Sequence, residues 1–148
     1  MNDISGKLLV GAIENCDLPE LEITGLTIRV DTGAQTSSLH VDNIVELERG
    51  GEKWVSFDIH PDIHDVDRVV RREAKVAAER VIKSSNGTRQ TRYIISTLLI
   101  LGGQRWQIQI SLTDRSGMSY LMLLGREAMG NRLLVDPARE YILSSLSS

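Results

Sequence analysis

A short segment near the start of the chain carries residue types suited to acid–base chemistry. Positions 31–34 read Asp-Thr-Gly-Ala and follow directly on an apolar, β-type run that ends at Val30. Gly33 can adopt the backbone angles of a tight loop, and Thr32 offers a hydroxyl group to a neighbouring loop. A buried aspartate needs such donors, because an unpaired polar group costs about 1–3 kcal/mol. Asp31 is therefore the first candidate for a catalytic carboxylate, although the same residues also suit an ordinary polar turn.

A second segment, far along the chain, strengthens the interpretation of the first as a functional motif. Positions 123–126 read Leu-Leu-Gly-Arg, and residues 126–131 have the pattern of one or two helical turns. Neither segment is specific alone. Their occurrence in this order, each after a pair of apolar residues, is the more informative observation.

The elements that would position these segments are mostly strands. Gly102-Gly103 between two β-type runs is the clearest hairpin signal, and a slip in the alternation near Gly25 indicates a turn or a bulge. Residues 73–83 fit either an amphipathic helix or a strand. The pattern favours one all-β domain over residues 1–148, a barrel or a sandwich with little helix. The polar Glu14 is expected to end a first strand at 7–13. Apolar or alternating runs predict further strands at 21–30, 54–59, 93–101, 106–112, 120–124, 133–135 and 141–143.

The composition is that of a globular protein, with 41% hydrophobic and 25% charged residues in 148, which argues against disorder. The start of the chain lacks the pattern of a signal peptide, and no stretch approaches the roughly 18 apolar residues that span a bilayer. Cys16 is the only cysteine, so no internal disulfide can form. We expect a cytoplasmic protein without a membrane segment, in which Cys16 is an ordinary surface or core residue.

The two motifs resemble those of the retropepsins, the single-domain aspartic proteases known from retroviruses. In these proteases two apolar residues precede Asp-Thr-Gly-Ala and, later, two apolar residues precede Gly-Arg. The second motif packs beneath the catalytic loop there and leads into a short helix. The resemblance therefore implies a retropepsin-like, acid-protease barrel with one short helix after the Leu-Leu-Gly-Arg motif. It also implies that Thr32, Gly33 and Ala34 support a catalytic Asp31, and that Leu124, Gly125 and Arg126 pack under this loop.

More closely, the chain resembles a bacterial family of retropepsin-like proteins whose members carry the label ATP-dependent zinc protease. The similarity spans residues 7 to 145, nearly the whole chain. The block at 30–40, Val-Asp-Thr-Gly-Ala-Gln-Thr-Ser-Ser-Leu-His, is the specific part. Shorter matches are Leu-Pro-Glu-Leu at 18–21, Ser-Ser-Asn-Gly at 84–87 and Met-Leu-Leu-Gly-Arg at 122–126.

The mechanism that this resemblance implies needs two aspartates. Two carboxyl groups that face each other closely do not both ionise easily, so the pair shares a proton and titrates as a unit. The ionised partner draws a proton from water while the protonated partner polarises the scissile carbonyl. The chain has a single Asp-Thr-Gly. A two-fold homodimer would supply the second Asp31, with Thr32 joining the two loops by hydrogen bonds. We therefore expect an aspartic endopeptidase that works as a homodimer.

Retropepsins also close a hairpin, the flap, over the substrate, and residues 84–88 fit the tip of such a hairpin. They read Ser-Ser-Asn-Gly-Thr and lie between the ambiguous segment 73–83 and a clear strand. If this is the flap, segment 73–83 is a strand. An ordinary exposed hairpin is an equally weighted interpretation. The residues expected to contact substrate are Ser85, Asn86, Gly87, Arg89 and Arg92.

The charge of this region predicts an acidic peptide or protein substrate. Residues 68–92 hold eight basic residues against two acidic ones, a net charge of +6, while the whole chain carries −3. Such an excess is either a solvated face or an attraction for an acidic ligand. The segment has no aromatic residue, which argues against nucleic acid. Relatives occur alongside ATP-grasp ligases that append glutamates to a ribosomal protein. The resemblance thus implies a functional link to such a ligase and a glutamate-rich tail as substrate.

The histidines raise an alternative. His60 and His64 are four positions apart, but Pro61 stands where a zinc-protease motif has glutamate, so we expect an acidic loop and no metal. No Gly-rich phosphate loop occurs, and no cofactor is expected. His40, inside the family block, either lies near the cleft or is a structural histidine. Two other functions stay open: a zinc-dependent hydrolase, as the family label suggests, and a non-catalytic, dimeric peptide-binding module with the same fold.

Overall fold

The chain folds almost entirely into strands. The computed structural model describes residues 3–4, 6–60, 67–83, 87–114 and 120–143. The all-β prediction is confirmed, the ambiguous segment 73–83 is a strand, and a short helix follows the Leu-Leu-Gly-Arg motif. In chain order the elements are β1 Asp3–Ile4, β2 Lys7–Gly11, β3 Ile13–Leu18, the 3₁₀ turn η1 Pro19–Leu21, β4 Ile23–Val30, β5 Ser37–Arg49, β6 Glu52–Ile59, β7 Val70–Lys83, β8 Arg89–Leu101, β9 Gln104–Asp114, β10 Met122–Leu124, α1 Arg126–Met129 and β11 Leu133–Asp136.

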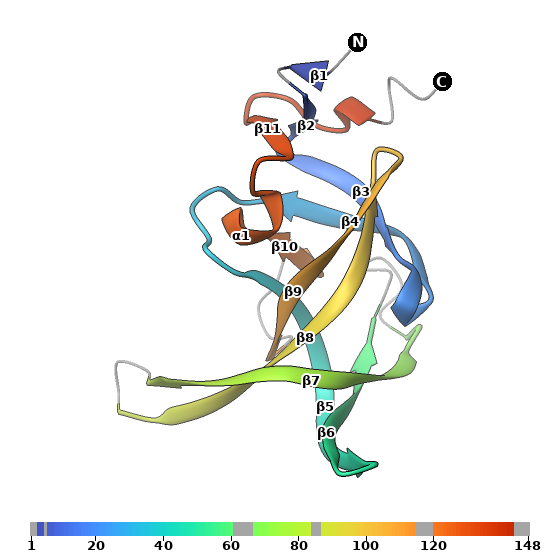
Figure 1. Cartoon of the computed structure of the whole chain (residues 1–148), viewed down its shortest axis with the longest axis vertical. Coiled ribbons are helices and arrows are strands. Elements are labelled where there is room, and N and C mark those ends of the chain that lie inside the picture. Colours follow the sequence, from blue (N-terminus) through green and yellow to red (C-terminus); the bar gives the residue numbers. More distant parts are fainter. Residues whose placement is uncertain (1–2, 5, 61–66, 84–86, 115–119, 144–148) are drawn as a thin grey trace.

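The strands form one large and one small sheet (Figure 1). The eight-stranded sheet has the order β10-β4-β3-β8-β7-β6-β5-β9. Two further pairings, β10–β5 and β8–β9, join strands that are far apart in this order, so the sheet curves back on itself around the core. The small sheet joins β1, β2 and β11. The core is made of fully buried apolar side chains such as Phe57, Leu26, Ile28 and Ile110. None of the helices described is long and apolar enough to cross a membrane.

Two turn signals in the sequence correspond to observed turns. Gly102 and Gly103 join β8 to β9 with φ angles of 59° and 80°, as a two-residue hairpin requires. In β4, Gly25 has a φ of 67° and lies where the pairing with β3 gains a residue, which makes a bulge. The Asp17 carboxylate accepts the Gly25 N–H at 2.9 Å and holds this bulge.

Strands β7 and β8 continue beyond the rest of the large sheet as a hairpin arm, formed by residues 78–83 and 89–94 (Figure 1). The first part of β8 pairs with β7, and its second part pairs with β9. The register of β7 shifts between Val76 and Ala78. A bulge at this point increases the local twist. The arm therefore leaves the sheet at a defined place and projects from the body.

Two sequence predictions about the ends of elements are wrong. A strand was expected to end at Glu14, but β3 runs through Glu14, which is fully buried. Residues 141–143 were expected to be a strand, but Ile142 and Leu143 are helical. One contact explains both differences. The Glu14 carboxylate accepts the N–H groups of Gly11 at 2.7 Å, Ile142 at 3.0 Å and Leu143 at 3.3 Å, so a buried acid is satisfied by distant backbone.

Candidate active site

The loop between β4 and β5 holds Asp31 in a defined orientation. The Asp31 N–H donates to the Leu124 carbonyl at 2.9 Å, and the Asp31 carbonyl accepts the Ala34 N–H at 3.2 Å. The carboxylate oxygen Oδ1 accepts the Gly33 N–H at 2.9 Å. Asp31 is half-buried, whereas Thr32 and Gly33 are exposed. The carboxylate is thus fixed by its own loop and still lies near the surface, where another molecule can meet it.

Strand β10 supports this loop from below. It pairs in parallel with β4, with Leu124 opposite Val30, and antiparallel with β5, with Leu123 opposite Ser38. Gly125 follows directly, and its N–H donates to the Ser37 hydroxyl at 2.9 Å. A Cβ atom at Gly125 would lie 2.6 Å from the Thr36 carbonyl carbon. Glycine is needed here because two backbones cross at a distance that leaves no room for a side chain.

The start of α1 ties down the rest of the loop. Arg126 donates from Nη1 to the Thr32 carbonyl at 3.0 Å and from its main chain to the Ala34 carbonyl at 2.8 Å. The Thr36 hydroxyl donates to Glu127 Oε1 at 2.9 Å. The structure thus brings Asp31, Thr32 and Ala34 together with the Leu-Leu-Gly-Arg segment. Glu127 and Thr36 were not singled out from the sequence, because their contact joins residues 91 positions apart.

The expected flap residues lie on the arm, in part outside the described residues. Ser85 and Asn86 belong to that part of the chain about which the structure says nothing. Gly87 and Arg89 are exposed, and Arg92 is half-buried. Arg89 and Arg92 are three positions apart on β8, so their side chains lie on opposite faces of the hairpin.

Arg80, a further arginine of the arm, was not singled out from the sequence. Its Nη1 lies 3.4 Å from the Thr36 hydroxyl, which belongs to the Asp31 loop. The pairing of β7 with β8 sets Arg80 directly opposite Arg92. The sequence contained a signal for this pairing. Arg80 and Arg92 are each six positions from Asn86, so a hairpin with its tip at Asn86 would set them opposite each other.

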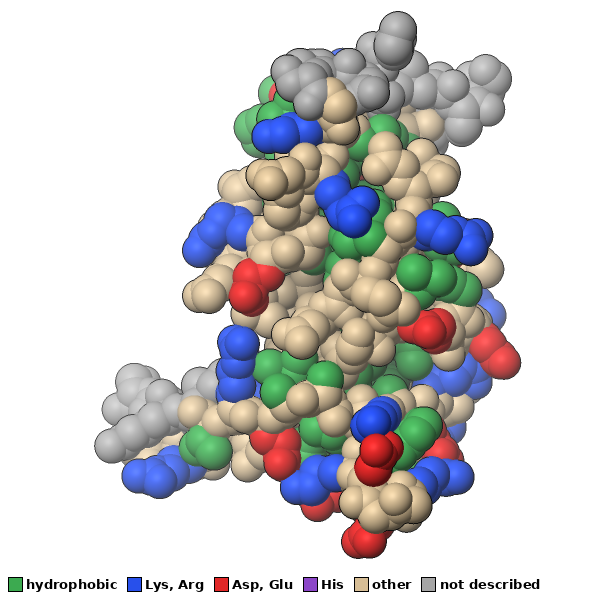
Figure 2. All heavy atoms as spheres, viewed as in Figure 1, with side chains coloured by type: hydrophobic (Ala, Val, Ile, Leu, Met, Phe, Trp, Pro, Cys, Tyr) green, Lys and Arg blue, Asp and Glu red, His purple; other side chains and the backbone are tan. Residues whose placement is uncertain are grey.

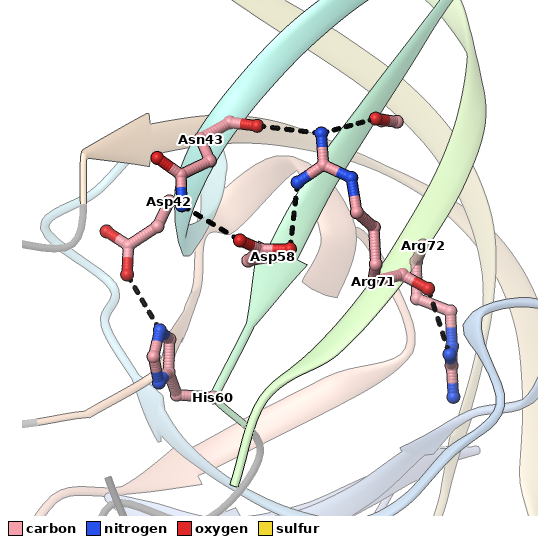
Figure 3. Close-up of polar contacts among 7 residues, drawn as sticks. Asp42, Asn43, Asp58, His60, Arg71 and Arg72 are labelled. Atoms are coloured by element: carbon pink, nitrogen blue, oxygen red, sulfur yellow. Dashed lines mark hydrogen bonds and ion pairs between the residues drawn. The ribbon is translucent and has the colours of Figure 1, made fainter. Parts of the chain in front are cut away.

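His60 and His40 both take part in polar contacts on the large sheet, and Figure 3 shows that of His60. His60 Nε2 lies 2.7 Å from Asp42 Oδ2. His40 Nδ1 lies 3.1 Å from the Thr113 hydroxyl. No cluster of three potential metal ligands occurs in the described part of the chain, from which His64 is missing.

The same region contains a network around Arg71 (Figure 3). Arg71 donates to Asp58 Oδ1 at 2.8 Å and to the Ser56 hydroxyl at 2.6 Å. Asn43 Nδ2 donates to Asp58 Oδ2 at 2.9 Å. The hydrogen bond from Asn43, followed by that from Arg71, lowers the pKa of Asp58. These contacts join β5, β6 and β7. Asp58 therefore has a structural role in holding the three strands together.

Two other features carry no chemistry for this site. Cys16 is buried, and burial followed by the nearby Asp17 charge raises its pKa to about 12, so it is no thiolate nucleophile at neutral pH. A pocket of about 500 Å³ opens beside α1 and β9, where Arg132 stacks on Trp106 at 5.0 Å. Asp31 does not line this pocket.

Fold and loop geometry define the class: the chain has an aspartic-peptidase-like, all-β fold with one Asp-Thr-Gly loop. The family model for RimB-like proteins, described as the retropepsin-like aspartic endopeptidase RimB, matches residues 9–145. The chain belongs to this RimB-like family, and the resemblance predicted from its motifs is confirmed.

The relatives and a similar solved structure carry other names than the family model. A probable alpha-L-glutamate ligase of Shewanella pealeana is 46% identical over 137 residues, which cover 93% of this chain and 30% of that protein. A probable alpha-L-glutamate ligase of Parasynechococcus marenigrum is 46% identical over 140 residues, 95% of this chain and again 30% of the relative. The chain therefore spans about 30% of the length of these relatives. The crystal structure of Lpg0085 from Legionella pneumophila, a DUF785 protein of unknown function, superposes with a TM-score of 0.74 at 27% identity, covering 91% of this chain and 97% of that one.

Proposed function

We propose that the protein is an aspartic endopeptidase that works as a homodimer, with one Asp31 from each chain. The observation that carries this proposal is the Asp31 loop itself. Its carboxylate accepts the Gly33 N–H at 2.9 Å, and it stands beside the exposed Thr32. One carboxylate cannot accept a proton and donate one in the same step. A single Asp-Thr-Gly at an exposed loop therefore suits a site that is completed by a second copy of the chain.

In the proposed mechanism the two Asp31 carboxyl groups share one proton. Their proximity makes double ionisation costly, so one group stays protonated where an isolated aspartate would be ionised. The ionised group accepts a proton from the attacking water, and the protonated group donates a hydrogen bond to the scissile carbonyl. The chain's contribution is to orient its carboxylate, through Gly33, and to fix the loop through the Asp31–Leu124 and Arg126–Thr32 hydrogen bonds.

The proposed substrate is an acidic peptide, and a glutamate-rich tail fits best. The support is the basic segment 68–92 and the names of the relatives, in which a region like this chain makes up 30% of a probable alpha-L-glutamate ligase. If the matching region of such a relative also acts as a peptidase, a ligase and a peptidase within one chain would suit a common substrate. We therefore propose that the peptidase acts on tails made by a glutamate ligase and works alongside that enzyme.

The replacement Asp31→Asn tests the proposal. It keeps the size and hydrogen bonding of the loop but removes the ionisable group, so cleavage of a glutamate-containing peptide should fall by at least about a thousandfold. The mutant should remain a dimer by analytical ultracentrifugation. Asp67→Asn, an equal change at an exposed position, should keep full activity.

Inhibitors separate this proposal from the two other functions. A pepstatin-type inhibitor should block cleavage, and a chelator should not. Cleavage that survives in Asp31→Asn, or that a chelator abolishes, would instead favour a zinc-dependent hydrolase. A dimer that binds peptides with no cleavage by the natural sequence would favour the peptide-binding module.

A further inference from the structure

Three of the eight basic residues in the segment 68–92 pair with carboxylates elsewhere in the molecule. Arg71 pairs with Asp58 at 2.8 Å, Arg72 with Glu22 at 3.7 Å and Lys75 with Glu52 at 2.8 Å. These pairs lie on the part of β7 that is hydrogen-bonded to β6 or next to it. The uncompensated charge that the sequence suggested is therefore concentrated farther along, on the hairpin arm.

Arg80 and Arg92 stand on the arm as a pair of like charges. They are directly opposite each other in the β7–β8 ladder, so their side chains share one face of the hairpin. Across the described ranges of the chain, neither guanidinium group has a carboxylate within ion-pair distance. Like charges in this position destabilise a hairpin. The pair is thus a cost to folding that nothing in the described structure offsets.

Arg92 adds a second observation. Its Nε atom is closed to solvent, yet it has no hydrogen-bond partner among the described residues. A buried, charged donor without an acceptor is costly, and such groups are uncommon in folded proteins. Arg80 makes only a long contact, 3.4 Å, to the uncharged hydroxyl of Thr36. Both side chains therefore have donor capacity to spare for an anion.

Arg80 reaches the proposed catalytic loop, and Arg92 lies opposite Arg80 in the ladder. Thr36, which Arg80 contacts, follows Asp31 in the same loop and donates to Glu127 of α1. Figure 2 shows the outline of the molecule indented between the projecting arm and the body above it, with Lys or Arg side chains along the arm. A peptide in this indentation would lie between the arm and the loop of Asp31.

We infer that Arg80 and Arg92 together bind a carboxylate of the substrate, a glutamate or aspartate side chain, and hold it beside the Asp31 loop. Guanidinium groups are planar and bind carboxylates through paired hydrogen bonds, and an acceptor for Arg92 Nε would satisfy its buried donor. The inference rests on the proposed function, because it takes the ligand to be an acidic peptide. It goes further by naming the residues that select the acid.

The test measures binding in the Asp31→Asn background, so that it does not depend on cleavage. The probes are a fluorescent peptide rich in glutamate and the same peptide with glutamine, followed by anisotropy. Arg80→Ala and Arg92→Ala should each weaken binding of the glutamate peptide by about tenfold, because each removes charged hydrogen bonds. Binding of the glutamine peptide should not change. Free glutamate at equal concentration should compete poorly if the peptide, and not the amino acid, is the ligand.

Two matched variants control for charge alone. Arg105→Ala removes an exposed arginine from β9 and should leave binding unchanged. Arg89, which the sequence led us to expect at the substrate, lies on the face of the arm opposite to Arg92 and is outside the inferred carboxylate site. Arg89→Ala removes the same charge and should weaken binding by no more than about twofold, through long-range attraction. A loss with Arg89→Ala as large as with Arg92→Ala would overturn the inference, because general attraction by the arm would then explain binding.

Thermal unfolding separates recognition from a structural role. Removing one of two like charges should leave the melting temperature unchanged or raise it, whereas a structural role predicts a lower one. The failures of the two proposals are distinguishable. If binding is specific for glutamate and depends on Arg80 and Arg92, but the natural sequence cleaves nothing, only the proposed peptidase activity is refuted. If neutral and acidic peptides are cleaved with equal efficiency and neither arginine replacement changes this, only the inferred carboxylate site is refuted.

Discussion

Two carboxylates in this chain differ in what their surroundings leave them free to do. Glu14 is fully buried and accepts three backbone N–H groups, from Gly11, Ile142 and Leu143. Asp31 is half-buried and accepts one, from its own loop. A buried carboxylate that accepts several backbone N–H groups stabilises a fold, whereas one with unused lone pairs at the surface can bind a water molecule or a second carboxyl group. The hydrogen-bond partners therefore separate a structural acid from a candidate catalytic one.

Removing the Glu14 carboxylate should destabilise the protein strongly. Glu14→Ala removes a buried carboxylate that accepts three backbone N–H groups, which we expect to lower the free energy of unfolding by about 3 kcal/mol. The measurement is urea denaturation. Glu48→Ala, at an exposed position of β5, is the matched control and should change stability by less than about 0.5 kcal/mol. Equal effects of the two replacements would show that the buried contacts contribute little.

At the scale of elements, the local pattern predicted strands well where one face of a strand is buried. The alternation at 54–59 corresponds to β6, and Gly102-Gly103 is the observed turn between β8 and β9. The segment 73–83 was ambiguous because helical and strand periods both fit its alanines. Hydrogen bonds to β6 on one side and β8 on the other settle it as β7, and such pairings are invisible in a local window.

Long-range contacts explain what the sequence did not reveal. The polar Glu14 was expected to end a strand, but its partners lie at the other end of the chain. The Thr36–Glu127 hydrogen bond under the loop has the same character. By contrast, the candidate site residues Asp31 and Gly125 were found early, because their types are unusual at the ends of apolar runs and their order matched a known pattern.

Gly125 should be the least replaceable residue among the elements that support the loop. In Gly125→Ala the new Cβ would meet the Thr36 carbonyl carbon at 2.6 Å, so backbone must move, and we expect a loss of about 2–4 kcal/mol in the free energy of unfolding. Gly103→Ala, at a φ of 80° with open space around it, should cost only about 1 kcal/mol through backbone strain. Urea denaturation of both variants checks this order. Equal losses would mean that the crossing at Gly125 adapts easily.

At the scale of the whole molecule, the proposed site is assembled from three distant parts of the chain. The loop of residues 31–36 follows β4, its support comes from β10 and α1, and the arm that faces it comes from β7 and β8 (Figure 1). What one chain does not contain is a second Asp-Thr-Gly. The proposed mechanism therefore requires that two chains associate.

A dimer that carries one natural chain and one Asp31→Asn chain gives the most direct test. The two chains would be co-expressed with different affinity tags, and the mixed dimer would be purified through both. If each active site takes one Asp31 from each chain, the mixed dimer should be about as inactive as the doubly mutated one, while a doubly tagged natural dimer stays fully active. A mixed dimer that keeps about half of the natural activity would mean that every chain has a complete site of its own, and would contradict the account.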